Sequence, residues 1–317
     1  MASGMINFPL NTGKSIPTIG LGTILLRGDQ SLVVDAVLHA IKVGYRHFDT
    51  ATNYGTEGVL GEALAEAFRS GSVSREEVFV TSKLWNSDHE PEDVLPAVQK
   101  SLSLLQLDYI DLYLIHFPLK FKKGVRIPSK GDDFLPVDIK ATWQALEKCV
   151  EEGLVHAIGV SNFTVEKLTS LLDYAKIVPS VNQVERHPVW QQKKLKPFCD
   201  AKGIHVSGWS PLGAPGTVYG THVVLSNPVI QSIAERHGKT AAQVALRWGV
   251  QTGASVLPKS FNPKRIAENF DIFSWELSED DITQISKIEQ RRSVPCEVFC
   301  NPNGSPRNPE ELWDGDM

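Results

Sequence analysis

Short apolar runs alternate along the chain with longer stretches in which apolar residues recur every three or four positions. The short runs are typical of strands buried on both faces of a parallel sheet, and the longer stretches are typical of amphipathic helices. Near the start, the turn sequence Asn11-Thr12-Gly13 predicts a small hairpin of residues 6–8 and 15–17. After this hairpin we expect eight strands, at residues 19–23, 47–50, 78–84, 110–116, 157–161, 181–185, 205–209 and 254–257.

A helical pattern follows each of these strands. The predicted helices cover residues 30–43, 57–70, 91–105, 137–152, 164–174, 191–202, 228–237, 240–252, 263–270 and 278–289. Ser31 is expected to cap the first helix, and Pro91 suits the first turn of the third. Residues 117–137 and 210–227 have no sustained period, so we expect two long irregular loops there, the first of them over the mouth of the fold.

Repeated strand–helix units predict an α/β fold, and eight of them favour a closed (β/α)8 TIM barrel with extra helices and the N-terminal hairpin as a plug. The alternative is an open doubly wound sheet. It is weakened because no Gly-x-Gly-x-x-Gly motif follows the first strand and opens a helix; Gly20-Leu21-Gly22 is the nearest approach. We expect a single barrel domain over residues 1–317, with residues 1–5 disordered and residues 290–317 forming a C-terminal substrate loop.

Composition excludes several classes of protein. The 317 residues carry a net charge of −5, with 42% hydrophobic and 22% charged residues, which gives no reason to expect nucleic-acid or membrane binding. No apolar run is long enough to span a bilayer, and the start lacks a signal-peptide pattern, so we expect a cytoplasmic protein. The four cysteines show no Cys-x-x-Cys pattern and are expected to be reduced thiols.

The carboxyl ends of the strands in an α/β barrel face the active site. The residues at these ends are Thr23, Asp49, Lys83, His116, Ser161, Asn162, Gln183, Trp209 and Lys259. Asp49, Lys83 and His116 end neighbouring strands, and Tyr54 follows the first of these strands in a polar loop. An acid, a lysine, a histidine and a tyrosine are therefore expected to converge at one mouth.

This group of side chains suggests proton donation to an oxygen atom. A lysine cation should lower the pKa of a tyrosine from its usual value of about 10, and Asp49 would hold Lys83 charged and oriented. His116 could hydrogen-bond the substrate oxygen. We expect no metal site, because His47, the other candidate ligand, should point away from the mouth by strand alternation. Taken alone, Asp49 with Lys83 could instead be a structural salt bridge, and His116 a core histidine.

The chain also resembles the aldo-keto reductases, and in particular their plant-type subgroup. The resemblance rests on GYRHFDTATNYG, TSKLW, LDYIDLYLIHFP, AIGVSNF, VNQVE and LPKSFNPKRIAEN, which stand in the order and spacing of that family's blocks, and on the tail EELWDGDM. The resemblance implies a catalytic tetrad of Asp49, Tyr54, Lys83 and His116, with Tyr54 as the general acid. This set is the same as the one taken from the strand ends.

The resemblance further implies an NADPH/NADP+ cofactor, bound without a Rossmann domain. Ser161, Asn162 and Gln183 would hold the nicotinamide carboxamide, and Trp209 would stack on the ring where most relatives have tyrosine. The loop 210–216 would cover the pyrophosphate, and Lys259 and Arg265 would bind the 2′-phosphate. The remaining cofactor residues implied are Gly22, Thr23, Asp49, Ser210, Pro211, Leu212, Gly213, Ser260, Phe261, Asn262, Glu268 and Asn269.

The substrate pocket is expected to include Tyr54, His116 and four further residues, Ile24, Trp85, Phe117 and Cys300. Many relatives have tryptophan at the positions of Ile24 and Phe117, so a wider pocket for bulkier carbonyl compounds is our hypothesis. Members of the plant subgroup range from general aldehyde reductases in detoxification to selective ketone reductases in specialised metabolism. The chain is expected to act as a monomer. A non-catalytic NADPH sensor, or a barrel enzyme with Lys83 as a Schiff base, remain alternatives.

Overall fold

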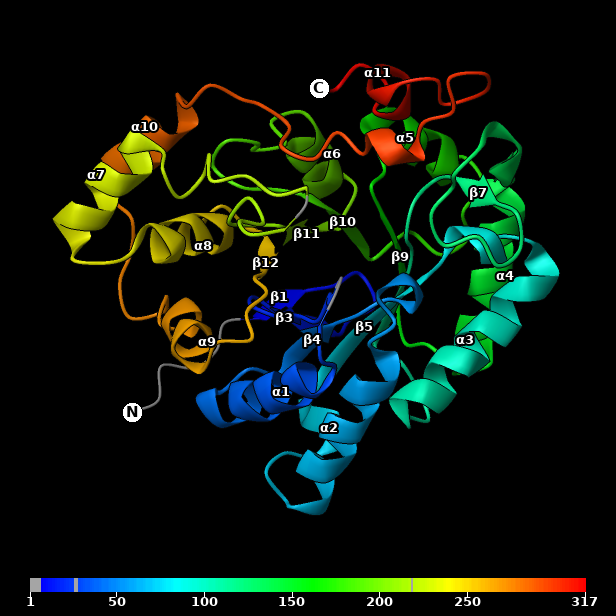
Figure 1. The fold of residues 1–317 in the computed structure, drawn as a ribbon, viewed down its shortest axis with the longest axis horizontal. Helices are drawn as coiled ribbons and strands as arrows, with labels where there is room; N and C mark the ends of the chain where they lie inside the picture. Colours follow the sequence, from blue (N-terminus) through cyan, green and yellow to red (C-terminus); the bar gives the residue numbers. More distant parts are fainter. Residues whose placement is uncertain (1–6, 26–27, 218) are drawn as a thin grey trace.

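The computed structural model describes residues 7–25, 28–217 and 219–317. Its centre is an eight-stranded parallel sheet in which the strands follow one another in chain order (Figure 1). The strands are β3 (Leu21–Gly22), β4 (His47–Asp49), β5 (Phe79–Leu84), β6 (Leu112–Ile115), β9 (Ile158–Ser161), β10 (Val181–Glu185), β11 (His205–Trp209) and β12 (Ser255–Leu257). The expected TIM-barrel fold is confirmed.

Hydrogen bonds between the first and last segments of the sheet close the barrel. The Gly20 amide donates to the Val256 carbonyl at 2.9 Å, and the Val256 amide donates to the Thr18 carbonyl at 2.9 Å. Higher up, the Gly22 amide donates to the Pro258 carbonyl at 3.0 Å. Closure leaves no open strand edge and brings the ends of β4 and β10 around one mouth.

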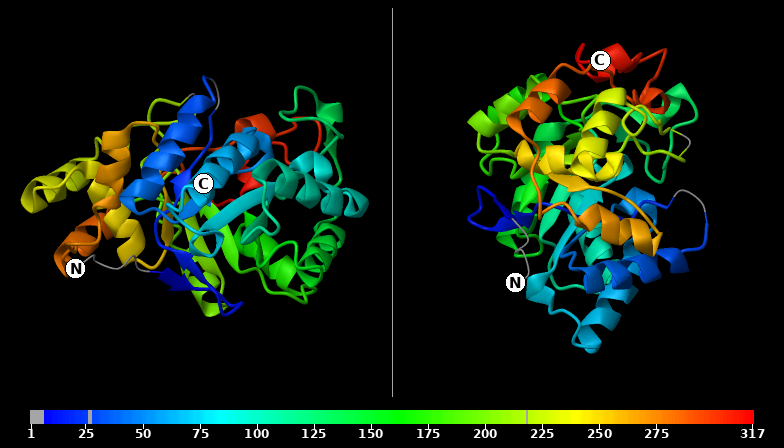
Figure 2. Two further views of the ribbon diagram at one scale, coloured as in Figure 1. Left: turned by 90° about the horizontal axis from the view of Figure 1, so that it is seen from below. Right: turned by 90° about the vertical axis from the view of Figure 1, so that its left-hand side faces the viewer.

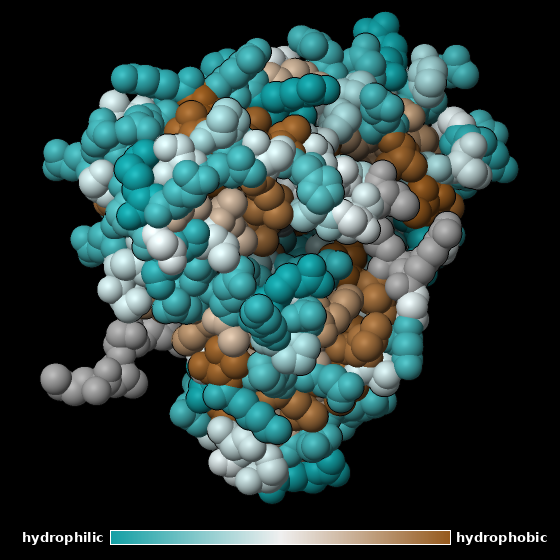
Figure 3. Space-filling model, turned by 60° about the vertical axis from the view of Figure 1, so that its left-hand side comes forward, coloured by the Kyte–Doolittle hydropathy of each residue, from teal (hydrophilic) through white to brown (hydrophobic). Residues whose placement is uncertain are grey.

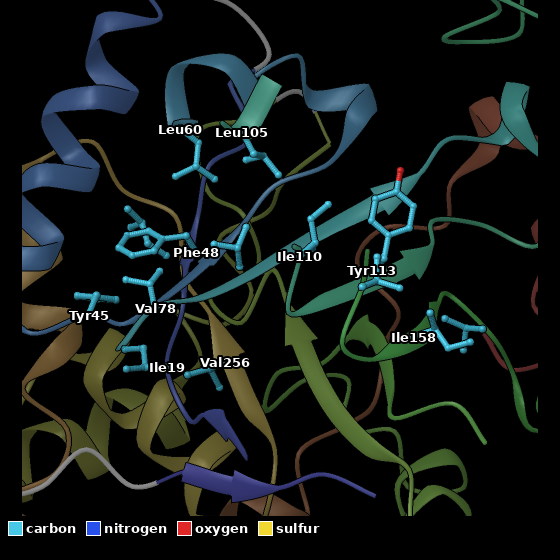
Figure 4. Packing of buried hydrophobic residues seen from close by; sticks show 14 of the residues in the cluster. Ile19, Tyr45, Phe48, Leu60, Val78, Leu105, Ile110, Tyr113, Ile158 and Val256 are labelled. Carbon is cyan, nitrogen blue, oxygen red and sulfur yellow. The ribbon is translucent and has the colours of Figure 1, made fainter. Parts of the chain in front are cut away.

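Helices surround the sheet, as the 3.6-residue periodicity predicts (Figures 1 and 2). They are α1 (Ser31–Val43), α2 (Glu57–Arg69), α3 (Pro91–Leu105), α4 (Ile139–Glu151), α5 (Val165–Leu172), α6 (Leu195–Ala201), α7 (Pro228–His237), α8 (Ala241–Gln251), α9 (Pro263–Phe270), α10 (Glu279–Ser286) and α11 (Pro309–Leu312). Figure 4 shows how Phe48, Val78 and Leu60 lie in the layer between the sheet and these helices.

Two predictions about helix starts are wrong. Ser31 is the first helical residue of α1 and not its cap; its amide donates to Asp29 Oδ1 at 2.9 Å, so Asp29 fills the capping role. The helix expected from residue 191 begins only at Leu195, because Gln192 has a left-handed φ of +59°, which a right-handed helix cannot include.

The predicted hairpin is formed by β1 (Asn7–Pro9) and β2 (Ser15–Pro17), which pair antiparallel. Its Leu10 and Ile16 pack with Phe79, Leu112 and Val181, whose strands begin at this end of the barrel, so the hairpin plugs the end opposite the mouth. The disorder expected for residues 1–5 lies outside the described residues, as does Ile6 of the hairpin.

The segment 117–137 is more ordered than its lack of period suggested. It contains the strand pair β7 (Lys120–Phe121) and β8 (Phe134–Leu135), which forms a second small sheet. Phe121 from this pair packs with Trp85, Phe117 and Trp313, so the loop and the C-terminal tail share one apolar cluster.

The face drawn in Figure 3 is mostly polar, with apolar side chains in patches near its middle. None of the helices described is both long and apolar enough to cross a bilayer.

Close packing of α2 on α3 gives a test of the barrel's outer layer. A Cβ on Gly61 would lie 2.7 Å from the backbone carbon of Leu105, whereas one on Gly58 would meet only the Leu104 side chain at 3.9 Å. We expect Gly61→Ala to lower the free energy of unfolding by roughly 1–3 kcal/mol through this overlap with the backbone. Gly58→Ala in the same helix should leave it unchanged or raise it by up to about 1 kcal/mol. Denaturant titration measures both, and equal effects would contradict this view of the packing.

Candidate active site

Lys83 is the centre of the group predicted at the mouth. Its Nζ donates to Asp49 Oδ1 at 2.7 Å, to the Thr50 carbonyl at 2.8 Å and to the Tyr54 hydroxyl at 3.2 Å. An ammonium has three N–H donors, so these three bonds use all of them. The Lys83 side chain is fully buried. The structure therefore brings Asp49, Lys83 and Tyr54 together as one hydrogen-bonded unit.

The local fold explains why these side chains meet. Asp49 pairs with Thr81 in the parallel register of β4 and β5, so Lys83, two residues beyond Thr81, points to the same side of the sheet. Tyr54 ends the short 3-10 helix η1 (Thr52–Tyr54). The Thr52 hydroxyl donates to the Lys83 carbonyl at 3.1 Å, which fixes η1 against β5.

His116 follows β6 and lies among aromatic rings. Its ring is edge-on to Tyr54, with centroids 5.5 Å apart, and edge-on to Trp85 at 5.0 Å. Phe117 stacks on the imidazole at 5.5 Å. These contacts hold His116 beside the Tyr54 ring at the mouth, as the strand ends predicted.

Burial changes the pKa values of Tyr54 and Lys83 more than expected from the sequence. It raises the pKa of Tyr54 well above its usual value of 10, and the Asp49 carboxylate adds to the rise. The expectation of a lowered Tyr54 pKa is wrong for the structure, because removal from water and the Asp49 carboxylate both raise it. Burial also lowers the pKa of Lys83, against the opposing effect of Asp49. Tyr54 is consequently a neutral phenol at physiological pH, which is the form that can donate a proton.

The reasoning that placed His47 away from the site needs correction. His47 and Asp49 are two residues apart in β4, so alternation puts them on the same side of the strand. His47 lies deeper in the barrel, with its Nε2 3.0 Å from the Thr81 hydroxyl and its ring edge-on to Phe79. Its burial lowers the pKa to about 4. Depth in the barrel, and not strand face, separates it from the mouth.

Four of the residues assigned to the nicotinamide form a network joined to Asp49. Gln183 Nε2 donates to Asp49 Oδ2 at 2.7 Å, and the Ser161 hydroxyl donates to the Gln183 carbonyl at 2.7 Å. Asn162 Nδ2 donates to the His116 carbonyl at 2.9 Å, and Trp209 Nε1 donates to Asn162 Oδ1 at 3.0 Å. Asn162 adopts φ of +64°, a strained conformation that the network maintains.

One cavity of about 1260 Å³ joins the tetrad to the predicted cofactor residues. Most of the predicted site residues line it, namely Gly22, Ile24, Asp49, Tyr54, Trp85, His116, Phe117, Ser161, Asn162, Gln183, Trp209, Ser210, Pro211, Leu212, Lys259, Ser260, Phe261, Asn262, Arg265, Glu268 and Asn269. A single hollow large enough for a dinucleotide and a second molecule therefore runs across the mouth of the barrel.

Within the described part of the chain, four predicted site residues do not line this cavity. Lys83 lies behind Tyr54. Thr23 is fully buried, and its hydroxyl donates to the Asp49 carbonyl at 3.0 Å, so it supports the strand end. Gly213 has φ of +79°, and a Cβ there would approach the Thr221 carbonyl. Cys300 packs against the same apolar cluster as the lining residues Trp85 and Phe117, without itself lining the cavity.

Sequence reasoning missed several lining residues on the loops. They are Asn53, Ile127, Tyr219, Cys296, Val298 and Phe299. The sequence assigned residues 290–317 to a substrate loop. That assignment identified the segment, but not which of its residues face the cavity. Cys296 lines the cavity and Cys300 does not, because the tail turns through a left-handed residue at Cys296 (φ +60°) and a 3-10 helix, η5 (Glu297–Phe299).

The far end of the cavity carries positive charge. Lys259 and Arg265 both line it, and their mutual repulsion adds to the effect of burial in lowering the pKa of Lys259. Two like charges held close together are unfavourable unless an anion joins them. Asn262 caps α9 through its Oδ1, which accepts from the Arg265 amide at 3.1 Å, so the N-terminus of α9 points into the same region.

His116 offers a direct test of these electrostatics. Burial and the Lys83 cation lower its pKa well below 6.5, so its imidazole should be neutral throughout the range between about pH 5 and pH 8. NMR of the imidazole nitrogens, assigned with a His116→Gln variant, should show no titration of this residue in that range. Titration near the usual histidine pKa would contradict the burial seen here.

Comparisons with known proteins show the family of the chain. A sequence model described as the Aldo/keto reductase family matches residues 18–290. The chain is 51% identical over 308 residues to the (1S)-1,7-diacetoxy-luvungin A aldo-keto reductase of Citrus sinensis, covering 97% of this chain and 96% of that one. It is 49% identical over 318 residues to aldo-keto reductase family 4 member C11 of Arabidopsis thaliana, covering 100% of each.

A solved structure of similar fold is the aldose reductase from Schistosoma japonicum. It matches with a TM-score of 0.86 and 38% identity, covering 93% of this chain and 96% of that one. The resemblance to plant-type relatives is thus confirmed by sequence, and the barrel is confirmed by structure. The chain is an oxidoreductase that belongs to the aldo/keto reductase family.

Proposed function

We propose that this protein reduces aldehydes or ketones to alcohols with NADPH, and that Tyr54 is the general acid. The observation that carries the proposal is the Lys83 ammonium, fully buried and bonded at once to Asp49 and to the Tyr54 hydroxyl. A salt bridge needed only for stability would not have to hold a tyrosine at the wall of a large cavity. Tyr54 is moreover neutral and next to His116.

The residues at the nicotinamide end fit a carboxamide. Both N–H donors of Asn162 are engaged, with the His116 carbonyl and the Ser161 hydroxyl, and one N–H of Gln183 is engaged with Asp49. What these side chains still offer is mainly oxygen lone pairs, which suit the amide N–H donors of a carboxamide. When bound, the nicotinamide would supply a hydride. Gln183, Asn162 and Ser161 would hold the ring beside Tyr54.

NADPH is preferred over NADH in this proposal because of the charged end of the cavity. Lys259 and Arg265 lie together there, next to the capped N-terminus of α9. Two cations and a helix N-terminus suit the dianionic 2′-phosphate that distinguishes NADPH, and Arg can bind it through two hydrogen bonds. Without that phosphate the two like charges would repel each other.

Proton delivery follows from the contacts of Tyr54. As its O–H bond breaks toward a carbonyl oxygen, negative charge grows on the phenol oxygen, which lies 3.2 Å from Lys83 Nζ. The ammonium stabilises this charge only as it forms, and so favours the transition state. The Asp49 carboxylate opposes the lowering of the Lys83 pKa by burial, and so favours the ammonium form. A neutral His116 retains one ring N–H with which to orient the carbonyl oxygen.

The substrate half of the cavity favours a bulky apolar carbonyl compound. Its walls include Ile24, Trp85, Phe117, Ile127 and Phe299. The Citrus sinensis relative, 51% identical, is named for a diacetoxy compound, which supports a large substrate for this chain as well. This observation favours a selective reductase of specialised metabolism over general aldehyde detoxification.

Two other readings fit less well. A Schiff-base enzyme would need Lys83 Nζ to reach a carbonyl carbon, yet the side chain is fully buried and all three of its N–H donors are used. A cofactor sensor would not need the whole Asp49–Lys83–Tyr54 unit to be assembled beside His116.

Replacing Tyr54 by Phe tests the chemistry. We expect Tyr54→Phe to bind NADPH as the wild type does, measured by quenching of tryptophan fluorescence, while turnover of a carbonyl panel falls roughly 10²–10⁴-fold through loss of the acid. Tyr113→Phe is the matched control, since this buried tyrosine bonds Ser101 outside the cavity and should keep full activity. Undiminished turnover by Tyr54→Phe would rule out its role. NADPH binding without turnover in the wild type would instead favour the sensor.

Replacing Ile24 by Trp tests the substrate class. The larger ring should narrow the substrate half, so kcat/KM for a bulky polycyclic ketone should fall roughly tenfold or more relative to a small aldehyde. Leu32→Trp, at an exposed position of α1, controls for the added ring and should leave the ratio unchanged. An unchanged preference in Ile24→Trp would count against a pocket widened at this position.

A further inference from the structure

The C-terminal tail forms one wall of the substrate half of the cavity. Six consecutive residues, 294–299, line it, and two of them, Cys296 and Phe299, pack in one cluster with Trp85 and Phe117 from the barrel. A wall built from a tail has no sheet to set its position. The contacts between residues 290–294 and the barrel therefore determine the position of the wall formed by residues 294–299.

Glu185, the last residue of β10, makes the most direct of these contacts. Its side chain is fully buried and lies outside the lining of the cavity. One carboxylate oxygen accepts from the Ser293 amide at 2.9 Å and lies 3.0 Å from His187 Nε2; the other accepts from the Val294 amide at 3.2 Å. A buried carboxylate is costly unless its oxygens are bonded, so β10 and the tail are coupled at this point.

Arg292 completes the attachment from the tail side. Its guanidinium lies between the Trp190 and Trp313 rings, 4.8 Å and 3.8 Å from their centroids. It donates to the Asp316 carbonyl at 2.9 Å, and its Nη1 is 4.0 Å from Glu185 Oε2. The side chain is 3% exposed. A planar cation stacked on two rings near a carboxylate is held in one orientation.

The same cluster also fixes the next turn of the tail. Trp313 Nε1 donates to the Pro295 carbonyl at 2.9 Å, directly before Cys296 turns the chain into η5. The wall is thus held at its first two residues by Glu185 and Trp313. It is not held by a regular element between residues 290 and 296.

We propose that Glu185, with Arg292 beside it, is a positioning residue that sets the 294–299 wall and thereby the size of carbonyl compound the cavity admits. The inference rests on the proposed reductase function for its kinetic part only. Glu185 does not touch the tetrad's reacting atoms, and it acts through the Ser293 and Val294 amides. Its loss should change substrate binding and leave the chemistry intact.

The test compares two buried glutamates that do the same local job. Glu185→Gln removes the charge that holds the tail. Glu147→Gln is the matched control, because Glu147 is also buried and accepts from two backbone amides, of Lys176 and Ile177 at 2.7 and 2.9 Å, away from the tail. The readouts are hydrogen exchange of the peptide 291–300, NADPH affinity, and KM and kcat for a bulky ketone and a small aldehyde.

In Glu185→Gln we expect the amides of residues 293 and 294 to exchange roughly tenfold faster, as for loss of a charge-assisted hydrogen bond. KM for the bulky ketone should shift roughly five- to tenfold, a change of the same origin. NADPH affinity and kcat for the small aldehyde should stay at wild-type values. Glu147→Gln should change neither the tail's exchange nor the KM. Unchanged exchange at 293–294, or equal kinetic changes in both variants, would overturn the proposal.

Arg292→Lys keeps the test decisive if Glu185→Gln does not fold. It retains a cation beside Glu185 but loses the planar stack between the two tryptophans. Faster exchange over residues 291–300 together with a raised KM for the bulky ketone would support the positioning role of Glu185 and Arg292. Wild-type values of both quantities would overturn it. Hydrogen exchange does not depend on turnover. An inactive wild type would therefore contradict the proposed function, while the attachment of residues 290–294 to Glu185 and Arg292 could still be tested.

Discussion

The active site depends on keeping one ammonium ion charged inside the barrel. Lys83 has no contact with solvent, and its charge is favoured there mainly by Asp49, which accepts from it together with the Thr50 carbonyl. Removing one partner of such a buried pair typically costs roughly 3–5 kcal/mol. Asp49 cannot change without disturbing Lys83, and Tyr54 then loses the group that would stabilise its phenolate.

Closure of the barrel extends this constraint around the mouth. Gln183, on β10, donates to the second oxygen of Asp49, on β4, although 134 positions separate them. Through Ser161 and Asn162 the network reaches His116 and Trp209. The groups that would bind the nicotinamide and those that would protonate the substrate are therefore one hydrogen-bonded structure, so hydride and proton would be delivered to one place.

Strand ends were predictable because a buried strand leaves a strong apolar signal and its C-terminal residue faces the mouth. This rule placed Asp49, Lys83 and His116 correctly at one site. The family resemblance assigned Thr23 to the cofactor, and in the structure the Thr23 hydroxyl bonds the Asp49 carbonyl. The direction of the Tyr54 pKa was missed, since burial depends on long-range packing that no local pattern encodes. Residues 117–137 and the C-terminal tail show no periodic hydrophobic pattern. The sequence therefore could not predict which of their residues pair, turn or face the cavity.

The proposed cofactor half and substrate half of the cavity are held together by different kinds of contacts, so they should tolerate substitution to different extents. Strand ends and their mutual hydrogen bonds form the nicotinamide end of the proposed cofactor half, where a change at Asn162 would disturb His116 and Trp209 together. In the proposed substrate half, one wall is the C-terminal tail, which is attached through a few buried groups such as Glu185 and Trp313. Residues 294–299 make none of the hydrogen bonds of the Asp49–Lys83–Tyr54 unit, so substrate preference could change while the proposed proton donor keeps its contacts.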